Sequence, residues 1–318
     1  MAEQKKKDWE KQTIEKIAME SLIQQKISRR WSIFFKLVGL IYLGWVLIFV
    51  LTSSNKSTIA TGDFTALITL SGEIGVDSEI SAFNIKSSLK EVYDNPGTQA
   101  LILAINSPGG SPVQSGIIND EINRYKSLYP QIPVYAVIED ICASGGYYIA
   151  VAADKIFVDK ASIVGSIGVL MNGFGFDKAI KNLGIERRLI TSGENKAILD
   201  PFLPVQPKQR EFMQELLKEV HKQFIEVVKK GRGNKLAINT EIFSGLFWSG
   251  ESAIKLGLAD DYGDIDLVAR EVIGHEKIID FTTQSNFADR FAKKLGASIG
   301  SSLKSEILNN NLKNIKLN

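Results

Sequence analysis

The chain has 318 residues, of which 44% are hydrophobic and 23% charged, so it is long enough to bury the core of one large domain or of two ordinary ones. Its formal net charge of +2 gives no overall case for a nucleic-acid-binding protein, which needs a strongly basic surface. A single cysteine, Cys142, excludes an intrachain disulfide and a cysteine-based metal cluster.

The first fifty residues change sharply in character. Residues 1–30 are polar and basic, whereas residues 31–52 are apolar with Lys36 as their only charge. As a helix, this apolar segment would be roughly 30 Å long, which matches the hydrocarbon core of a bilayer. A cleaved signal peptide is the competing interpretation, but the segment is longer than a typical apolar region and lacks a terminal Ala-x-Ala. We therefore expect a retained signal anchor over residues 31–52.

The positive-inside rule sets the expected topology of this anchor. We expect a single-pass protein of the cell (inner) membrane, with residues 1–30 as a cytoplasmic basic segment. Everything after the anchor would then lie on the extracytoplasmic side. Residues 53–63, rich in Ser and Thr, are expected to be a polar linker. The polar tail over residues 282–318 is expected either to be disordered or to lie on the membrane.

Residues 64–281 show a globular pattern in which strands alternate with helices. This alternation predicts an α/β domain with parallel strands, because parallel neighbours need helical crossovers. Apolar runs predict strands at residues 65–70, 100–105, 132–138, 155–158 and 187–191. Helical periodicity predicts helices at residues 83–92, 112–125, 147–153, 177–183 and 208–230, and the last of these is expected to pack its apolar stripe on the sheet.

Ser144 is the candidate nucleophile. It follows a predicted buried strand and precedes Gly145 and Gly146 at the start of a predicted helix, where backbone N–H groups stabilise a developing negative charge. An ordinary Ser-Gly-Gly helix cap explains the same pattern equally well. The thiol of Cys142 is a competing nucleophile, but a small buried residue at the end of a strand is the favoured interpretation for it.

A serine nucleophile needs a base and an oxyanion hole. The two histidines, His221 and His275, lie outside any pattern typical of a site, so the sequence offers little material for a Ser-His-Asp triad. Lys196 is the candidate base, because burial against the apolar residues that follow it would lower its pKa toward neutral pH. Residues 106–110, Asn-Ser-Pro-Gly-Gly, end the preceding strand and could supply oxyanion amides together with Gly145, or form an ordinary turn.

Five motifs occur here in the order seen in the signal peptide peptidase A family of Ser-Lys proteases, which the chain resembles over about residues 64–275. They are Asn-Ser-Pro-Gly-Gly at 106–110, Ala-Ser-Gly-Gly-Tyr-Tyr at 143–148, Val-Gly-Ser-Ile-Gly-Val at 164–169, Ser-Gly-x-x-Lys at 192–196 with Asp-Pro at 200–201, and Trp-Ser-Gly at 248–250 with Gly-Leu-Ala-Asp at 257–260.

The resemblance implies a role for each matching position. Ser144 would be the nucleophile and Lys196 its general base, and Ser166 would orient the lysine amine. Gly110 and Gly145 would be the oxyanion amides, with Gly109 as a possible substitute for Gly110. No metal or other cofactor is implied.

The resemblance also implies architecture and substrates. The chain would be the short form of the family, with a single domain of the Clp protease/crotonase-like ββα spiral fold. It would assemble as a ring-like homo-oligomer whose dyads draw on neighbouring units. Its substrates would be hydrophobic peptides, above all signal peptides left in the membrane after precursor processing. Three alternatives stay open: a protease for specific membrane-associated partner proteins, a crotonase-like acyl-thioester enzyme, and a non-catalytic scaffold.

Overall fold

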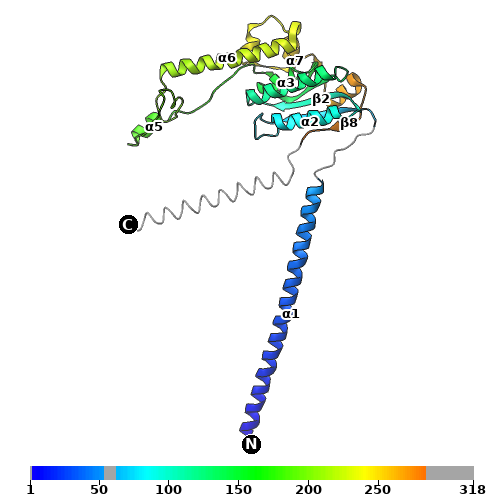
Figure 1. Cartoon of the computed structure of the whole chain (residues 1–318), viewed down its shortest axis with the longest axis vertical. Coiled ribbons are helices and arrows are strands. Elements are labelled where there is room, and N and C mark those ends of the chain that lie inside the picture. Colours follow the sequence, from blue (N-terminus) through cyan, green and yellow to red (C-terminus); the bar gives the residue numbers. More distant parts are fainter. Residues whose placement is uncertain (1, 54–61, 284–318) are drawn as a thin grey trace. The chain divides into compact units, whose positions relative to one another are not determined.

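The structure, a computed structural model, describes residues 2–53 and 62–283. It divides into two units, residues 1–58 with 285–318 and residues 59–284, which are treated separately here. The predicted tail at 282–318 and the predicted linker at 53–63 fall almost entirely outside the described residues. In the first unit the structure describes one helix, α1 (Ala2–Ser53) (Figure 1).

Helix α1 exposes large apolar side chains between Trp31 and Ile48. Nevertheless, within the described residues no helix combines the length and the apolar character needed to cross a bilayer. The membrane-spanning anchor expected over residues 31–52 is therefore not found in the described structure. The side chains at position 47 and from 49 to the end of that segment lie outside the described set.

The second unit is built on one mixed sheet, which confirms the predicted α/β class. Its main path runs β6-β5-β3-β2-β1-β8, and β4 pairs with both β3 and β7. Every pairing is parallel except that of β5 with β6. The bounds are β1 (Phe64–Ser71), β2 (Thr98–Ser107), β3 (Val134–Ala143), β4 (Lys155–Val158), β5 (Ile163–Gly165), β6 (Phe247–Ser249), β7 (Asp261–Tyr262) and β8 (Ile278–Asp280).

The central strands β1, β2 and β3 are covered on both faces, which explains their nearly continuous apolar sequences. On β2, Leu101, Leu103 and Ile105 belong to the larger core cluster, whereas Ile102 belongs to a second cluster with Val268. The larger cluster includes side chains from α2 (Ala82–Asp94), α3 (Pro112–Leu128), α4 (Gly145–Ala150), α6 (Pro207–Arg232) and α7 (Gly250–Lys255). The smaller one includes side chains from α8 (Ile265–Leu267) and from the π-helical turn η3 (Val268–Ile273) that continues it.

The helices beside the candidate site begin at identifiable caps. The Ser81 hydroxyl accepts a hydrogen bond from the Asn84 amide at the start of α2. The Ser111 hydroxyl does the same for the Gln114 amide at the start of α3, where Pro112 occupies the first turn. The predicted start of this helix at residue 112 is therefore confirmed.

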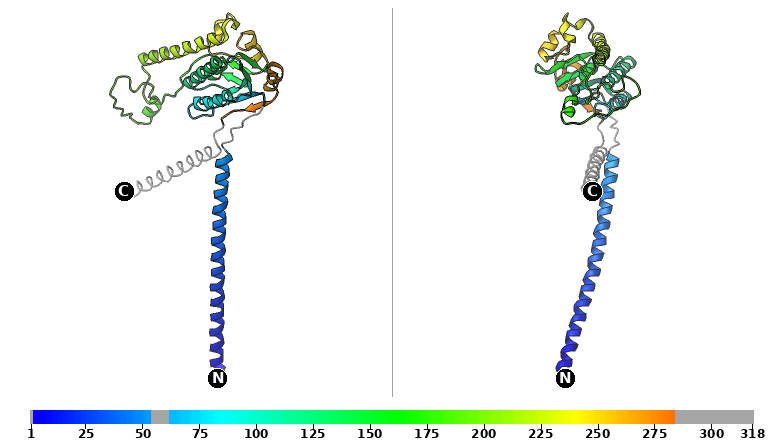
Figure 2. Two further views of the ribbon diagram at one scale, coloured as in Figure 1. Left: turned by 45° about the vertical axis from the view of Figure 1, so that its right-hand side comes forward. Right: turned by 90° about the vertical axis from the view of Figure 1, so that its left-hand side faces the viewer.

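The strand predicted at 187–191 is wrong. These residues form no strand, and they belong to an arm, defined here as residues 170–206, that contains the short helix α5 (Asp177–Asn182). In Figures 1 and 2, α5 lies apart from the sheet near the outer end of α6. The apolar residues that suggested a strand have no neighbouring strand to pair with, and Ile190 is 96% exposed.

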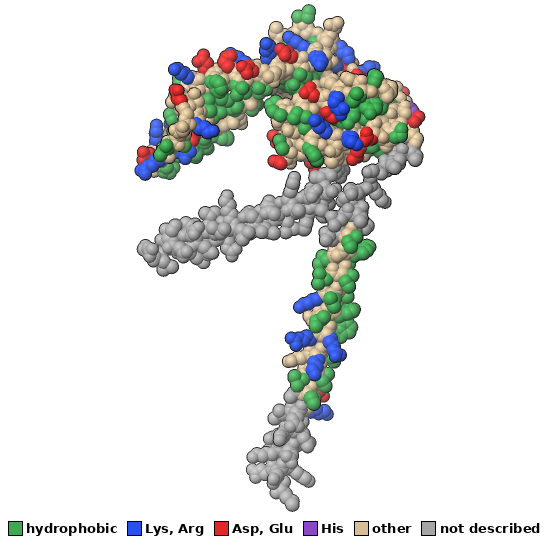
Figure 3. All heavy atoms as spheres, in the orientation of Figure 1, with side chains coloured by type: hydrophobic (Ala, Val, Ile, Leu, Met, Phe, Trp, Pro, Cys, Tyr) green, Lys and Arg blue, Asp and Glu red, His purple; other side chains and the backbone are tan. Residues whose placement is uncertain are grey.

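Helix α6 packs on the sheet domain only through its C-terminal half. There Phe224 and Val228 are buried, and the ring of Phe224 lies 5.0 Å from that of Tyr148 on α4. In the N-terminal half Phe212 is 62% and Leu216 40% exposed, so the predicted packing of the whole apolar stripe is only partly correct. Figure 3 shows hydrophobic side chains gathered along this projecting part and the arm.

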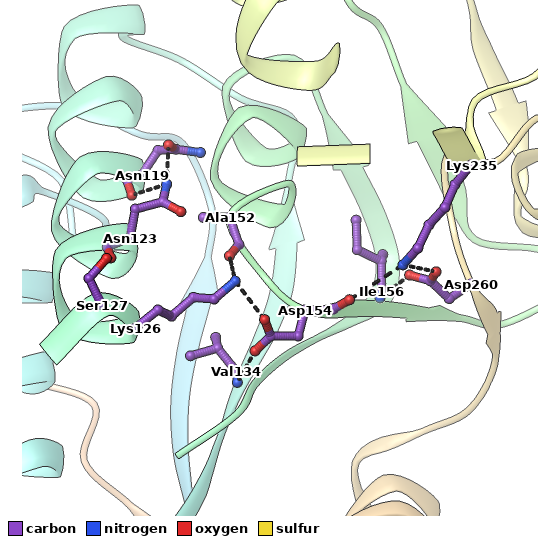
Figure 4. Close-up of polar contacts among 10 residues, drawn as sticks. All are labelled: Asn119, Asn123, Lys126, Ser127, Val134, Ala152, Asp154, Ile156, Lys235 and Asp260. Atoms are coloured by element: carbon purple, nitrogen blue, oxygen red, sulfur yellow. Dashed lines mark hydrogen bonds and ion pairs between the residues drawn. The ribbon is translucent and has the colours of Figure 1, made fainter. Parts of the chain in front are cut away.

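The packed end of α6 is fixed by a buried ion pair. Arg232, whose side chain is 1% exposed, donates from Nη1 to Asp260 at 2.7 Å and from Nε to the Gly257 carbonyl at 2.8 Å. Asp260 also accepts from Lys235 at 2.7 Å and from the Ile156 amide at 2.8 Å. Figure 4 shows Asp260 at the first residues of β4, close to the Lys126–Asp154 pair that binds the amide of Val134 on β3.

We expect Asp260→Asn to lower the free energy of unfolding by about 3–5 kcal/mol, because it leaves the buried Arg232 charge without a counter-ion. Burial alone would raise the pKa of the Asp260 carboxyl, but hydrogen bonds from Arg232 and Lys235 outweigh burial and lower it. A lowered folded-state pKa stabilises the fold above the ordinary Asp pKa of about 3.9 and stops doing so as the pH falls through the folded value. Urea titrations should therefore show a difference that is constant from pH 7 to about 5 and narrows below about pH 4. Glu251→Gln, which breaks the exposed pair with Lys255, is the matched control and should leave stability unchanged.

Candidate active site

Ser144 lies where β3 ends and α4 begins, as the sequence predicts. Its backbone has φ 51° and ψ −120°, a conformation that side chains rarely adopt, and its side chain makes no capping hydrogen bond. The Ser144 amide donates to the Gly165 carbonyl at 2.8 Å, and its carbonyl accepts from the Tyr148 amide at 3.0 Å. The strained turn is thus held by backbone bonds on both sides, which leaves the partly exposed hydroxyl uncommitted.

The glycine loop at the end of β2 lies directly against this turn, because β2 and β3 are parallel neighbours. A Cβ added to Gly109 would lie 2.7 Å from Ser144 Cβ and 2.8 Å from the Gly145 nitrogen. A Cβ added to Gly145 would lie 3.3 Å from the Gly110 nitrogen. The two predicted oxyanion residues therefore sit side by side next to Ser144.

Both of these amides lack an acceptor in the part of the chain that the structure describes. Gly110 forms an isolated bridge with Ile74, in which the Ile74 amide donates to Gly109 O and the Ser111 amide donates to Ile74 O, both at 2.8 Å. This pattern does not use the Gly110 N–H. Within the described residues, neither the Gly110 nor the Gly145 amide donates a hydrogen bond to any acceptor. Two unpaired N–H groups beside a serine hydroxyl form the arrangement that stabilises a tetrahedral oxyanion.

We expect Gly110→Ala to lower kcat by about 10²-fold, because it would displace one of these amides. The new Cβ would lie 2.1 Å from the Ile74 carbonyl oxygen, and φ of 149° is unfavourable for alanine. The control is Gly116→Ala on α3, where the nearest atom to the new Cβ, Tyr148 Oη, is 3.8 Å away. Steady-state kinetics on a peptide substrate tests this expectation. Wild-type kcat in Gly110→Ala would contradict a role for the Gly110 amide.

Ser166 lies next to Ser144 through the pairing of β3 with β5. Ala143 is opposite Gly165 in this register, so the two serines follow paired residues, and both have positive φ, 51° and 52°. The Ser166 amide donates to the Leu246 carbonyl at 2.7 Å, which fixes the backbone of this segment. The Ser166 residue is partly exposed.

The structure also shows a contact that sequence reasoning missed. The imidazole Nε2 of His221, on α6, lies 3.0 Å from the carbonyl oxygen of Ile167, the residue after Ser166. No local pattern around His221 indicates this contact, because it depends on how α6 packs across the sheet domain. His221 thus ties α6 to the backbone of the Ser166 segment.

Lys196 is placed differently from the other predicted site residues. It lies in the arm, in a series of turns, and it is exposed, so the predicted burial against the apolar residues that follow it is wrong for the single chain. Within the described residues no hydrogen bond or ion pair joins Lys196 to Ser144 or Ser166. The structure therefore brings together Ser144, Ser166, Gly110 and Gly145, and it does not bring Lys196 to them.

The turns that carry Lys196 are nevertheless ordered by contacts inside the arm. Arg187 donates a hydrogen bond to Asp200 at 2.9 Å, and the Phe202 amide donates a second one. Both hydrogen bonds lower the pKa of the Asp200 carboxyl, and the one from Arg187 has the larger effect. The ring of Phe202 lies 5.8 Å from that of Phe176, whose amide donates to the Pro201 carbonyl at 2.6 Å. The Asp-Pro pair after Lys196 therefore stabilises the fold of the arm.

Cys142 is fully buried and paired with Ser107 in the register between β2 and β3. Burial raises the pKa of its thiol far above the ordinary range, which disfavours the thiolate that a nucleophilic cysteine requires. The prediction that Cys142 is a buried packing residue is confirmed.

Comparisons with known proteins bear directly on this site. The sequence model of peptidase family S49 matches residues 126–278, which include Ser144, Ser166 and Lys196. The chain is 42% identical over 205 residues to the Na(+)/H(+) antiporter NhaA of Brucella abortus, and the match covers 64% of this chain and 28% of that protein. It is 30% identical over 199 residues to the "Putative signal peptide peptidase SppA" of Enterococcus faecium, covering 63% of this chain and 57% of that one.

A third relative is matched over more of its own length. The chain is 34% identical over 192 residues to the "Putative protease slr0021" of Synechocystis, covering 60% of this chain and 68% of that protein. The chain thus spans between 28% and 68% of the length of these three relatives. The matched family motifs, together with the placement of Ser144 at a glycine turn, lead to one conclusion: the chain belongs to peptidase family S49, the signal peptide peptidase A family.

Proposed function

We propose that the protein is a serine endopeptidase in which Ser144 is the nucleophile and Lys196 the general base. The observation that carries the proposal is the convergence of Ser144 with two unpaired amides, those of Gly110 and Gly145, in a chain of peptidase family S49. Hydrolysis of a peptide bond through a serine nucleophile uses this combination, because negative charge develops on the carbonyl oxygen as the hydroxyl attacks.

The proposed reaction has two halves. Ser144 Oγ forms a bond to the scissile carbonyl carbon while its proton passes to the neutral amine of Lys196, and the carbonyl oxygen becomes an oxyanion bound by Gly110 and Gly145. Lys196 then gives that proton to the leaving amine as the C–N bond breaks, which leaves an acyl-Ser144 ester. Water then attacks the ester carbon while Lys196 takes a proton from it, and the same two amides bind the oxyanion. Lys196 returns this proton to Ser144 Oγ as the ester bond breaks. The hydroxyl of Ser166 would orient the Lys196 amine toward Ser144 Oγ.

The base would come from a second copy of the chain. Two features support this part of the proposal: Lys196 is exposed in an ordered arm, and the arm with the projecting half of α6 exposes large apolar side chains, among them Leu170, Phe174, Ile190 and Phe212. Exposed apolar surface of this kind marks interaction sites on soluble domains. A homo-oligomer in which each arm reaches the Ser144 turn of its neighbour would cover this surface and complete the dyad.

The proposed substrates are hydrophobic peptides, above all signal peptides that remain in the membrane. The Enterococcus faecium relative is named for this activity, and the region matched by the family model contains both Ser144 and Lys196. We further propose that the apolar stretch of α1 between Trp31 and Ile48 associates with the inner membrane, with the catalytic unit on the extracytoplasmic side. Reaction of cysteines placed at positions 20 and 75 with a membrane-impermeant reagent in intact cells would test this topology.

Cleavage of a synthetic signal peptide by the full-length chain in detergent tests the function. Fragments identified by mass spectrometry are expected from the wild-type protein and not from Ser144→Ala at the same oligomeric state. If neither protein cleaves this peptide or an unselected set of hydrophobic peptides, the proposed activity is overturned. Cleavage of a few membrane-associated proteins but not of signal peptides would support the peptidase activity and would show that the proposed substrate class is wrong.

A further inference from the structure

Ser107 belongs to the Asn-Ser-Pro-Gly-Gly motif, but the proposed mechanism gives it no role. It is the last residue of β2, its exposed fraction is 0%, and its hydroxyl makes two hydrogen bonds. Ser107 Oγ donates to the carbonyl oxygen of Gly72 at 2.6 Å and accepts from the amide of Gly109 at 3.2 Å. A single buried hydroxyl therefore joins the end of β1 to the glycine loop beside Ser144.

These bonds fix residues on both sides of the contact that orients the peptide group carrying the Gly110 amide. In a trans peptide the C=O of Gly109 and the N–H of Gly110 point in opposite directions, so fixing one fixes the other. The Gly109 carbonyl accepts from Ile74 N–H at 2.8 Å, and the Gly109 amide is held by Ser107. Ser107 also binds Gly72, which lies two residues before Ile74. It therefore maintains the spacing between the segment that contains Ile74 and the loop that contains Gly110, and this spacing sets the direction of the Gly110 N–H.

Ser107 also contacts the nucleophile side of the site. A Cβ added to Gly146, in the first turn of α4, would lie 3.1 Å from the carbonyl oxygen of Ser107 and 3.3 Å from its Cβ. Ser107 therefore packs between the loop that carries Gly110 and the turn that carries Ser144 and Gly145. Among the described serines, only Ser107 is hydrogen-bonded through its side chain to both Gly72 and Gly109.

We propose that Ser107 is a positioning residue that aims the Gly110 amide at the oxyanion, and this inference rests on the proposed peptidase function. It predicts a specific kinetic signature. A substrate in its ground state gains little from a correctly aimed oxyanion amide, whereas the tetrahedral state depends on it. Loss of the Ser107 hydroxyl should therefore change kcat and the affinity of a tetrahedral adduct while leaving KM almost unchanged.

The test compares Ser107→Ala with Thr98→Val in the full-length chain. Thr98 is the matched control because it is on the same strand, is 5% exposed, and donates from its hydroxyl to the Val92 carbonyl at 2.7 Å, but at the opposite end of β2. For each variant the folded fraction, kcat, KM and the inhibition constant of a peptide aldehyde are measured. The aldehyde carbon bonds to Ser144 Oγ, and its oxygen takes the position of the oxyanion.

For Ser107→Ala we expect kcat per folded molecule to fall by about 10- to 100-fold, with KM within about 2-fold and the aldehyde bound more weakly by the same factor as kcat. Thr98→Val should show none of these changes. If Ser107→Ala does not fold, Ser107→Cys, which keeps the buried volume with weaker hydrogen bonds, is measured in its place. An active wild-type protein with an unchanged Ser107 variant would overturn this inference alone, whereas an inactive wild-type protein would overturn the peptidase function and the inference with it.

Discussion

Ser144→Ala is expected to lower kcat by at least about 10⁴-fold while the protein stays folded. The large effect follows from the loss of the only proposed nucleophile, since the oxyanion amides alone leave a small residual rate. The fold should be retained because the Ser144 hydroxyl makes no capping hydrogen bond and the backbone bonds to Gly165 and Tyr148 remain. Alanine at φ 51° is about as strained as the serine it replaces.

Ser87→Ala is the control for this experiment, because it removes a hydroxyl from a partly exposed position on α2. Rates are measured on the same signal peptide at matched oligomeric state. Equal rates for wild type and Ser144→Ala would contradict the assignment of Ser144 as the nucleophile.

Lys196→Ala is expected to lower kcat by at least about 10³-fold, since a serine hydroxyl is a weak nucleophile without a base to accept its proton. Lys196→Arg should be equally inactive, because a guanidinium does not lose its proton near neutral pH. Lys181→Ala, which removes an exposed lysine from α5 in the same arm, should retain wild-type turnover. Full activity in Lys196→Ala would rule out the Ser-Lys dyad.

Mixing the two inactive variants tests whether the base comes from a second copy. In an oligomer reassembled from equal amounts of Ser144→Ala and Lys196→Ala, about one quarter of the sites would pair an intact serine with an intact neighbouring lysine. Activity should therefore return to about one quarter of the wild-type value. A mixture that stays inactive after exchange of subunits would place both residues of the dyad in one chain.

The sheet was predictable from the sequence because its strands are buried on both faces. The runs that gave β1, β2 and β4 are mostly apolar, and their observed bounds differ from the predicted ones by no more than two residues at either end. The same reasoning failed at 187–191, because an apolar run carries no information on whether another strand lies beside it. Here the run lies in the arm, and Leu189 and Ile190 are exposed.

The residues of the candidate site also differ in how far local sequence patterns could place them. Ser144, Gly110 and Gly145 could be placed from local patterns, because parallel neighbouring strands bring their carboxyl ends to one edge of the sheet. The exposure of Lys196 could not be predicted, since it depends on where the arm folds. The contacts of His221 and Ser107 also escaped the sequence, because both join segments far apart in the chain: His221 lies 54 residues from Ile167, and Ser107 lies 35 residues from Gly72.

Covalent labelling with a peptidyl fluorophosphonate tests the central claim most directly. The oxygen of an activated serine forms a bond to phosphorus, fluoride leaves, and the serine proton passes to the base, so only a serine that is both activated and accessible reacts. The full-length wild-type protein is expected to carry one phosphonyl group, located by peptide mapping on Ser144, with labelling strongly slowed in Lys196→Ala. Labelling of a different residue, or labelling of Ser144 at the same rate in Lys196→Ala, would contradict the account.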